Sequence, residues 1–191
     1  GTAELLRSFG CELHSSADLV QRFAAVWTPA QLDSHRGAQV ELHRIVKEAF
    51  GLIGSHLRGG TPIGEYDVQK FIEESFDRAG LWTESAPNVS VNANSAAPHY
   101  QPTADKSAPI SAGDFVLIDL WAKQKVANSV YGDITWCGVC APSPTDRQKQ
   151  IFDVVAAARD ASWELVRDQF GRRPLHGFEV DDAARKVIDG A

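Results

Sequence analysis

Two stretches in the middle of the chain decide its fold: Asp114-Phe115-Val116-Leu117-Ile118-Asp119-Leu120-Trp121 and Tyr131-Gly132-Asp133-Ile134-Thr135-Trp136. Both read as buried β-strands, yet each contains an aspartate, and a carboxylate in an apolar strand is costly unless its charge is satisfied. Alternation places Asp133 and Thr135 on one face of the second strand. If the two strands form a hairpin, Asp119 and Asp133 can face each other, and like charges across a strand pair destabilise it. A bound cation would reverse the sign of this effect.

The composition is that of an ordinary globular protein with one good core. The chain has 191 residues, of which 43% are hydrophobic and 23% charged. A net charge of -6 argues against a nucleic-acid partner, because proteins that bind nucleic acids usually present a basic face. No apolar run is long enough to cross a bilayer, and no segment resembles a signal peptide. We therefore expect a cytoplasmic protein without a membrane association.

The Cys137-Gly138-Val139-Cys140 segment has the spacing of half a zinc site or of a redox pair. No second cysteine pair and no histidine pair follows at ligand spacing, and the segment ends a predicted strand instead of opening a helix. We interpret the two cysteines as small residues at a strand end. The low, odd number of three cysteines indicates reduced thiols.

Helical periodicity surrounds the two strands. Apolar residues at three-and-four spacing predict a long helix over about 29–57, ended by Gly59-Gly60, and a second helix through 68–79, stopped by Gly80. A capping box at Thr145 predicts a third helix, and a fourth is expected to begin near Glu179. Before the long helix we expect a short strand over 11–13 and a helix from about residue 16. Residues 96–102, bracketed by prolines, are expected to form an extended loop.

The two predicted helix pairs repeat each other. A shift of 112 positions places the apolar residues of 42–53 on those of 154–165, and those of 68–79 on those of 180–191. One offset that holds across two helices and their turn favours a duplication. The first copy continues into the extended segment that carries both aspartates, whereas the second copy stops at the equivalent of residue 79. We therefore expect the second half of the sheet to be absent from this chain.

A divalent cation bound by carboxylates is the strongest chemical interpretation of Asp119 and Asp133, with Thr135 hydrogen-bonded to an unliganded oxygen. The alternative is that each aspartate caps a turn or pairs with a lysine or arginine. His99 lies before these strands and is a candidate for substrate binding, proton transfer or metal ligation, or is a structural surface histidine. The other five histidines have no acidic partner at ligand spacing and are expected to be solvated: His14, His35, His43, His56 and His176.

An ordered set of segments resembles the pita-bread metallopeptidases, which include methionine aminopeptidase, aminopeptidase P and prolidase, with creatinase as a non-metal relative. The resemblance covers about residues 30–191, and the aspartate strands are its most specific part. The matching segments are Asn94, Pro98-His99-Tyr100, Gly113–Asp119, Asp133-Ile134-Thr135 and Gly177–Asp181. Residues 1–28 resemble the end of the N-terminal domain carried by the aminopeptidase P and prolidase branch.

The resemblance implies an α+β pita-bread fold whose second half-sheet is missing from this chain. It implies three segments: the tail of a creatinase-like N-terminal domain and linker (1–28), a complete first repeat (29–140) and a truncated second repeat (141–191). It also implies two divalent metal ions (Mn, Co or Zn) with Asp119 and Asp133 as ligands, and His99 in contact with a peptide substrate. The family's remaining histidine and two glutamate ligands have no counterpart here. Residues 123–129 are expected to lengthen the hairpin loop, and the family favours a homodimer.

Three functions are compatible with these expectations. The first is metal-dependent hydrolysis of an N-terminal peptide bond, as in an Xaa-Pro aminopeptidase or dipeptidase, with this chain inactive by itself because its site is incomplete. The second is a catalytically inactive pita-bread domain that binds peptides or proteins. The third is a metal-free hydrolase of the creatinase type, which ranks last because that branch does not retain the aspartate pair.

Overall fold

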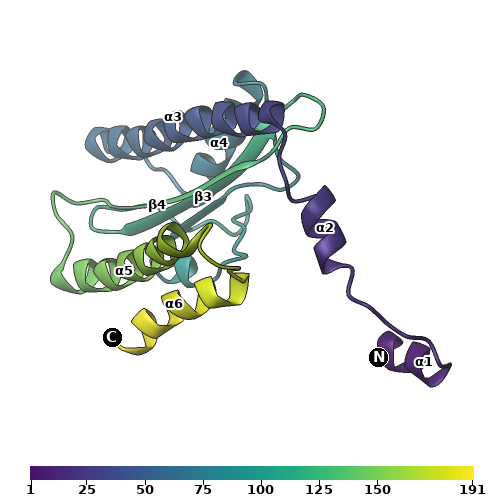
Figure 1. The fold of residues 1–191 in the computed structure, drawn as a ribbon. Helices are drawn as coiled ribbons and strands as arrows, with labels where there is room; N and C mark the ends of the chain where they lie inside the picture. Colours follow the sequence, from purple (N-terminus) through teal and green to yellow (C-terminus); the bar gives the residue numbers. More distant parts are fainter. The chain divides into compact units, whose positions relative to one another are not determined.

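A computed structural model describes residues 1–191, which form two compact units, Gly1–Cys140 and Ala141–Ala191 (Figure 1). Each unit is described by itself. The assignment of 1–28 to an N-terminal domain and of 29–191 to two repeats stays a prediction. None of the helices combines the length and apolar character needed to cross a membrane.

The first unit is built around two helices whose ends are set by local sequence. Helix α3 (Pro29–Gly59) begins at Thr28, whose side chain accepts from the backbone N–H of Gln31, and ends at Gly60 in the left-handed conformation with φ 67°. Helix α4 (Glu65–Arg78) follows after a short turn. The bounds predicted for both helices are confirmed to within a few residues.

A four-stranded antiparallel sheet follows helix α4. Strand β3 (Phe115–Gln124) is central to it, with β4 (Gly132–Val139) paired along its full length. Two shorter strands, β1 (Leu81–Trp82) and β2 (Asn88–Val91), also pair with β3. The β3–β4 hairpin that the sequence predicts is therefore confirmed.

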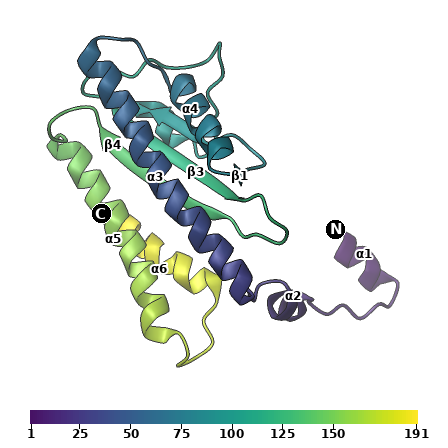
Figure 2. The same cartoon turned by 90° about the horizontal axis from the view of Figure 1, so that it is seen from above.

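Helices α3 and α4 cover one face of this sheet (Figure 2), and the hydrophobic core lies between the helices and the sheet. Alternate residues of β3 are buried there, because the strand's period of two directs them toward the helices. Helix α3 approaches β4 closely at Gly132, where an added Cβ would lie 2.9 Å from Leu42 Cδ1 and 3.2 Å from the backbone N of Gln39. The core residues that are fully buried include Leu42, Ile45, Val46, Val68, Ile72, Val89, Val116, Ile118 and Leu120.

The segment before α3 has two short helices, α1 (Thr2–Ser8) and α2 (Ala17–Phe23), and neither buries a residue. The helix expected from about residue 16 is confirmed. The strand expected over 11–13 is wrong: residues 11–16 have no regular structure. A strand is stabilised by its neighbours, and no sheet strand pairs with this segment.

Two connecting loops differ in detail from expectation. The segment between β2 and β3 opens with a short 3-10 helix, η1 (Asn92–Ala96), so only residues from 97 onward are a loop. The hairpin loop was expected over 123–129, but it occupies 125–131. Residues 123 and 124 remain in β3 because β1 pairs with them.

The second unit is a helical hairpin of α5 (Asp146–Gln169) and α6 (Gly177–Asp189). The capping box at Thr145 is confirmed, since its side chain accepts from the backbone N–H of Gln148. Helix α6 begins two residues before the position expected, and Ser162 Oγ of α5 donates to the carbonyl of Val180 at 3.0 Å. Within this unit only Ala158 is buried, so its helices present many exposed apolar side chains: Ile151, Phe152, Val155, Trp163, Phe178 and Ile188.

Candidate metal centre

The β3–β4 hairpin brings Asp119 and Asp133 to the same face of the sheet. Asp119 lies directly opposite Thr135, and Asp133 lies opposite Trp121. The two aspartates are therefore diagonal neighbours instead of a directly facing pair, which corrects the arrangement expected from the sequence. Diagonal residues of an antiparallel pair lie about 7–8 Å apart at their backbones, close enough for long or charged side chains to interact.

Thr135 is a neighbour of both aspartates: it lies directly opposite Asp119 and two residues from Asp133 on β4. Its hydroxyl donates to Asp119 Oδ1 at 2.7 Å, so the predicted hydrogen bond between these side chains is confirmed. Asp119 Oδ2 and both oxygens of the Asp133 carboxylate accept no hydrogen bond. These oxygens are the group that a cation would find available on this face.

The charge of one aspartate affects the other. Partial burial, and then the nearby charge of Asp119, raise the pKa of the Asp133 carboxyl above its usual range. A raised pKa means that the ionised form of the Asp133 carboxyl is disfavoured, because neither a hydrogen-bond donor nor a cationic side chain offsets its negative charge. This electrostatic cost is the property that the sequence suggested for the pair, and it makes the pair a natural place for positive charge.

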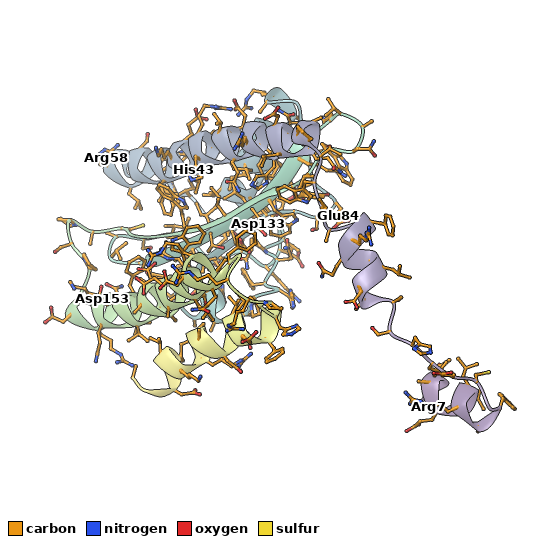
Figure 3. The ribbon with its side chains drawn as sticks, in the orientation of Figure 1. Arg7, His43, Arg58, Glu84, Asp133 and Asp153 are labelled. Carbon is orange, nitrogen blue, oxygen red and sulfur yellow. The ribbon has the colours of Figure 1, made fainter.

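The aspartates are less buried than their strands suggested. Asp119 is half-buried and Asp133 is exposed. Figure 3 shows Asp133 on the strand pair, and His43 on helix α3. The expectation of two buried charges is therefore wrong. The reason is that Val116, Ile118 and Leu120 are the β3 residues that face helices α3 and α4. Asp119 and Asp133 occupy alternate positions on the other face, where the neighbouring β3 side chains are only partly buried.

His99 lies in the loop that follows η1, where it is exposed and its ring makes no hydrogen bond. The structure does not gather it with the aspartates: no group of three or more His, Cys, Asp or Glu side chains is placed so as to hold a metal ion. The chain thus brings together Asp119, Asp133 and Thr135, and leaves His99 apart from them.

Four of the five histidines expected to be solvated have a specific partner. His43 Nδ1 lies 2.8 Å from the carbonyl oxygen of Gln39, and His56 Nδ1 lies 3.2 Å from that of Pro62. His35 Nδ1 lies 2.7 Å from the carbonyl oxygen of Tyr131, which ties helix α3 to the hairpin, and His14 Nε2 lies 2.9 Å from Glu12 Oε1. His14 thus has an acidic neighbour that was not expected, but it is solvated as expected, since 79% of its side chain is exposed.

The two cysteines of the C-x-x-C segment are free. Burial raises the pKa of both the Cys137 and the Cys140 thiols, which makes neither of them a reactive thiolate.

Sequence reasoning missed Asn88 of β2, which lies directly opposite Asp119 on the other edge of β3. Cross-strand partners share a face, so its amide is on the side of the aspartates. Asn88 is 3% exposed, and its Oδ1 atom is buried without a hydrogen-bond partner, as is Oγ of Ser90 two residues further on. The alternation Asn88-Val89-Ser90-Val91 was the signal that two polar residues share one face.

Sequence reasoning also missed Glu65, the first residue of helix α4, which is completely buried. Its carboxylate accepts hydrogen bonds from the segment that precedes β3. An acidic residue in the first turn of a helix is common on electrostatic grounds alone, so the sequence held no signal for this burial.

The arrangement of these elements defines the class of the fold. A long helix and a shorter one on one face of an antiparallel sheet, with acidic side chains on the other, form an α+β fold, and its structural neighbours are pita-bread proteins. A sequence model of metallopeptidase family M24 matches residues 39–191. The chain belongs to this family.

Solved structures agree with this assignment. Prolidase from Thermococcus sibiricus is 20% identical with a TM-score of 0.70, and the match covers all of this chain and 48% of that one. Dipeptidase PepE from Mycobacterium ulcerans is 21% identical with a TM-score of 0.70, covering 98% and 46%. X-prolyl aminopeptidase from Caenorhabditis elegans, described as a cytosolic enzyme with a di-nuclear active site, is 16% identical with a TM-score of 0.72, covering 90% and 27%.

The chain therefore spans about half the length, or less, of these structures. No curated protein sequence matches it.

Proposed function

We propose that the chain carries part of the site of a metal-dependent exopeptidase that hydrolyses the N-terminal peptide bond of a peptide, in the class of Xaa-Pro aminopeptidases and dipeptidases. The observation that carries the proposal is the Asp119–Asp133 pair, two carboxylates on one sheet face with three oxygens that accept no hydrogen bond. Membership of family M24 and the names of the structural neighbours, a prolidase, a dipeptidase and an X-prolyl aminopeptidase, support it.

The donor chemistry of this face fits divalent ions. Carboxylate oxygens suit Mn, and Co and Zn also accept them. We propose two such ions for the complete site, with Asp119 and Asp133 as the ligands that this chain supplies; a di-nuclear site is described for the X-prolyl aminopeptidase neighbour. Ions held there would supply an activated water and polarise the peptide carbonyl.

The roles of the chain's own side chains follow from their contacts. Thr135 occupies one oxygen of Asp119, which turns the other oxygen toward a ligand. Asp133 keeps both of its oxygens for ligation. His99 is exposed and has no competing partner, so we assign it the contact with substrate beside the scissile carbonyl, where an imidazole N–H can donate to the oxygen that gains charge.

Two carboxylates do not complete a coordination shell, and no third ligating side chain lies with them. We therefore propose that the 191-residue chain does not hydrolyse peptides by itself. A cytoplasmic location and a homodimer are part of the same proposal; the first is supported by the cytosolic C. elegans neighbour, and light scattering would test the second.

The test is metal binding. In titration calorimetry, we expect the chain to bind Mn²⁺ with a dissociation constant of about 10⁻³ M or weaker, and the Asp119→Asn/Asp133→Asn double variant to lose this binding. Asp153→Asn, an exposed aspartate on α5 paired with Lys149, is the matched control and should bind as the parent does. Binding that survives in the double variant would refute the metal site. Peptide binding that is indifferent to a chelator would favour the alternative, an inactive peptide-binding domain.

A further inference from the structure

Glu65 is the most completely satisfied charged group in the first unit. It is 0% exposed, and its carboxylate accepts four hydrogen bonds. Oε1 accepts from the backbone N–H of Val91 at 2.7 Å and from Asn94 Nδ2 at 2.9 Å. Oε2 accepts from the hydroxyl of Tyr100 at 2.6 Å and from the backbone N–H of Ala108 at 2.8 Å.

These four donors belong to one stretch of chain, from the last residue of β2 to Ala108, and His99 lies inside it. The backbone N–H of Glu65 also donates to the carbonyl of Ala108 at 3.0 Å, which closes the stretch against the start of α4. One side chain therefore holds both ends of the stretch and its middle.

The chemistry of the network specifies an ionised carboxylate. Such a group accepts only, through about four lone-pair sites, and here four donors occupy them. A glutamine of the same shape would place an NH₂ group against two of the donors. Tyr100 can rotate its hydroxyl to accept, but the backbone N–H groups of Val91 and Ala108 cannot. Each oxygen of Glu65 accepts from one of these two amides, so either orientation of the glutamine leaves a backbone N–H facing an NH₂ group.

His99 depends on this network because it has no anchor of its own. Its ring is exposed and makes no hydrogen bond, whereas Tyr100, the next residue, is bonded to Glu65. Asn94, in the middle of η1 and just before the loop, is bonded to the same carboxylate. The position of the imidazole is thus set by residues on both sides of it.

We propose that Glu65 is the positioning residue for His99: its buried carboxylate fixes the loop of 97–108 and thereby the place at which the imidazole meets a substrate. The proposal deepens the function proposed above and rests on it for the role of His99. The ordering of the loop by Glu65 is independent of metal and of turnover.

The experiment follows the His99 ring and two backbone amides by NMR in the 191-residue chain. The Cε1–H resonance of His99 is assigned by its loss in His99→Gln. In Glu65→Gln we expect this resonance to shift and broaden. We also expect hydrogen exchange to accelerate about tenfold or more at whichever of the Val91 and Ala108 amides faces the new NH₂ group, since that amide loses its acceptor.

Two further variants separate positioning from general destabilisation. Val68→Ala removes a fully buried side chain from the same helix without touching the network, and should leave the His99 resonance unchanged. Glu65→Asp restores an acceptor-only carboxylate and should return part of the parent spectrum. If Glu65→Gln does not fold, Tyr100→Phe, which removes a single donor, takes its place and should shift the same resonance.

A His99 resonance that is the same in the parent and in the folded Glu65 or Tyr100 variants would overturn the proposal, and so would an equal shift in Val68→Ala. Because the readouts need no metal, a failure of Mn²⁺ binding at Asp119 and Asp133 would reject the proposed function and leave this result standing.

Discussion

Glu65 and the Asp119–Asp133 pair are carboxylates of the same unit, but they differ in burial and in the hydrogen bonds that they accept. Glu65 has no exposed surface and four hydrogen-bond donors, whereas the Asp119 carboxylate accepts one hydrogen bond and the Asp133 carboxylate accepts none. All hydrogen-bonding positions of the Glu65 carboxylate are occupied by donors of the chain itself. Three carboxylate oxygens of the Asp119–Asp133 pair have no donor in the chain.

The difference shows that carboxylates of one unit can be either fully hydrogen-bonded in the interior or left without donors at the surface. A buried carboxylate is tolerated when its lone pairs are all satisfied, and it then fixes the segments that supply the donors. An unsatisfied pair raises the energy of the folded chain and is acceptable at an exposed face, where water and ions reach it. Substitutions at the two places should therefore have opposite effects on stability.

The largest effect is expected at Glu65. Glu65→Leu leaves four donors buried without an acceptor, and we expect the free energy of unfolding to fall by about 3–5 kcal/mol, the usual result of removing one partner from a buried charged network. Urea denaturation measures it. Glu48→Gln, at a half-exposed glutamate paired with Arg44, is the control and should change stability by no more than about 0.5 kcal/mol. If Glu65→Leu lowers the free energy of unfolding by less than about 1 kcal/mol, the Glu65 carboxylate does not hold the fold as its four hydrogen bonds predict.

A smaller loss is expected for Tyr100→Phe, about 1.5–3 kcal/mol at neutral pH, because one donor to the charged carboxylate disappears. Burial, and then the hydrogen bond and charge of Glu65, raise the pKa of Tyr100 from 10.0 to about 12. The folded state holds this proton more tightly than the unfolded state, so the parent keeps its stability below pH 10 and loses it as the pH rises toward 12.

Alkaline denaturation profiles check this expectation. The Tyr100→Phe profile should be flatter between pH 10 and 12, although Tyr131, whose pKa burial also raises, retains part of the loss. Tyr66→Phe leaves the Glu65 network intact and should reproduce the parent profile. A parent profile no steeper than that of Tyr100→Phe would refute the assigned hydrogen bond.

The smallest effect has the opposite sign. Asp133→Asn removes one of two like charges, and we expect the chain in the presence of a chelator to gain about 0.2–1 kcal/mol at neutral pH. The pKa of Asp133 is raised in the folded state, so the gain should appear as the pH rises above the usual value of 3.8 and vanish in acid. Asp182→Asn on α6, an exposed aspartate, serves as the control in the same denaturation experiment. A loss of stability in Asp133→Asn would show that the pair is already compensated.

Much of the first unit could be predicted because its signals are local. Capping residues and glycines mark the ends of α3 and α4, and the apolar run Phe115–Trp121 identifies a strand. The strand period of two also placed Asp133 and Thr135 on one face of the second strand.

The remainder depends on pairings that are distant in the sequence. The diagonal placement of Asp119 and Asp133 follows from where the hairpin loop starts, which β1 determines by extending β3. The burial of Glu65 needs donors from residues 91–108, up to 43 positions away, and no periodicity records them. The wrong strand over 11–13 has the same origin, since a strand exists only through its neighbour.

Gly132 gives the hairpin a mechanical link to helix α3. Because α3 lies against β4 at this point with no room for a Cβ, we expect a bulkier residue at position 42 to shift the backbone that carries Asp133, the next residue after Gly132. The spacing of the two carboxylates is therefore adjustable from the opposite side of the sheet. We therefore expect substitutions in the core of α3 to change the distance between the Asp119 and Asp133 carboxylates without altering either residue.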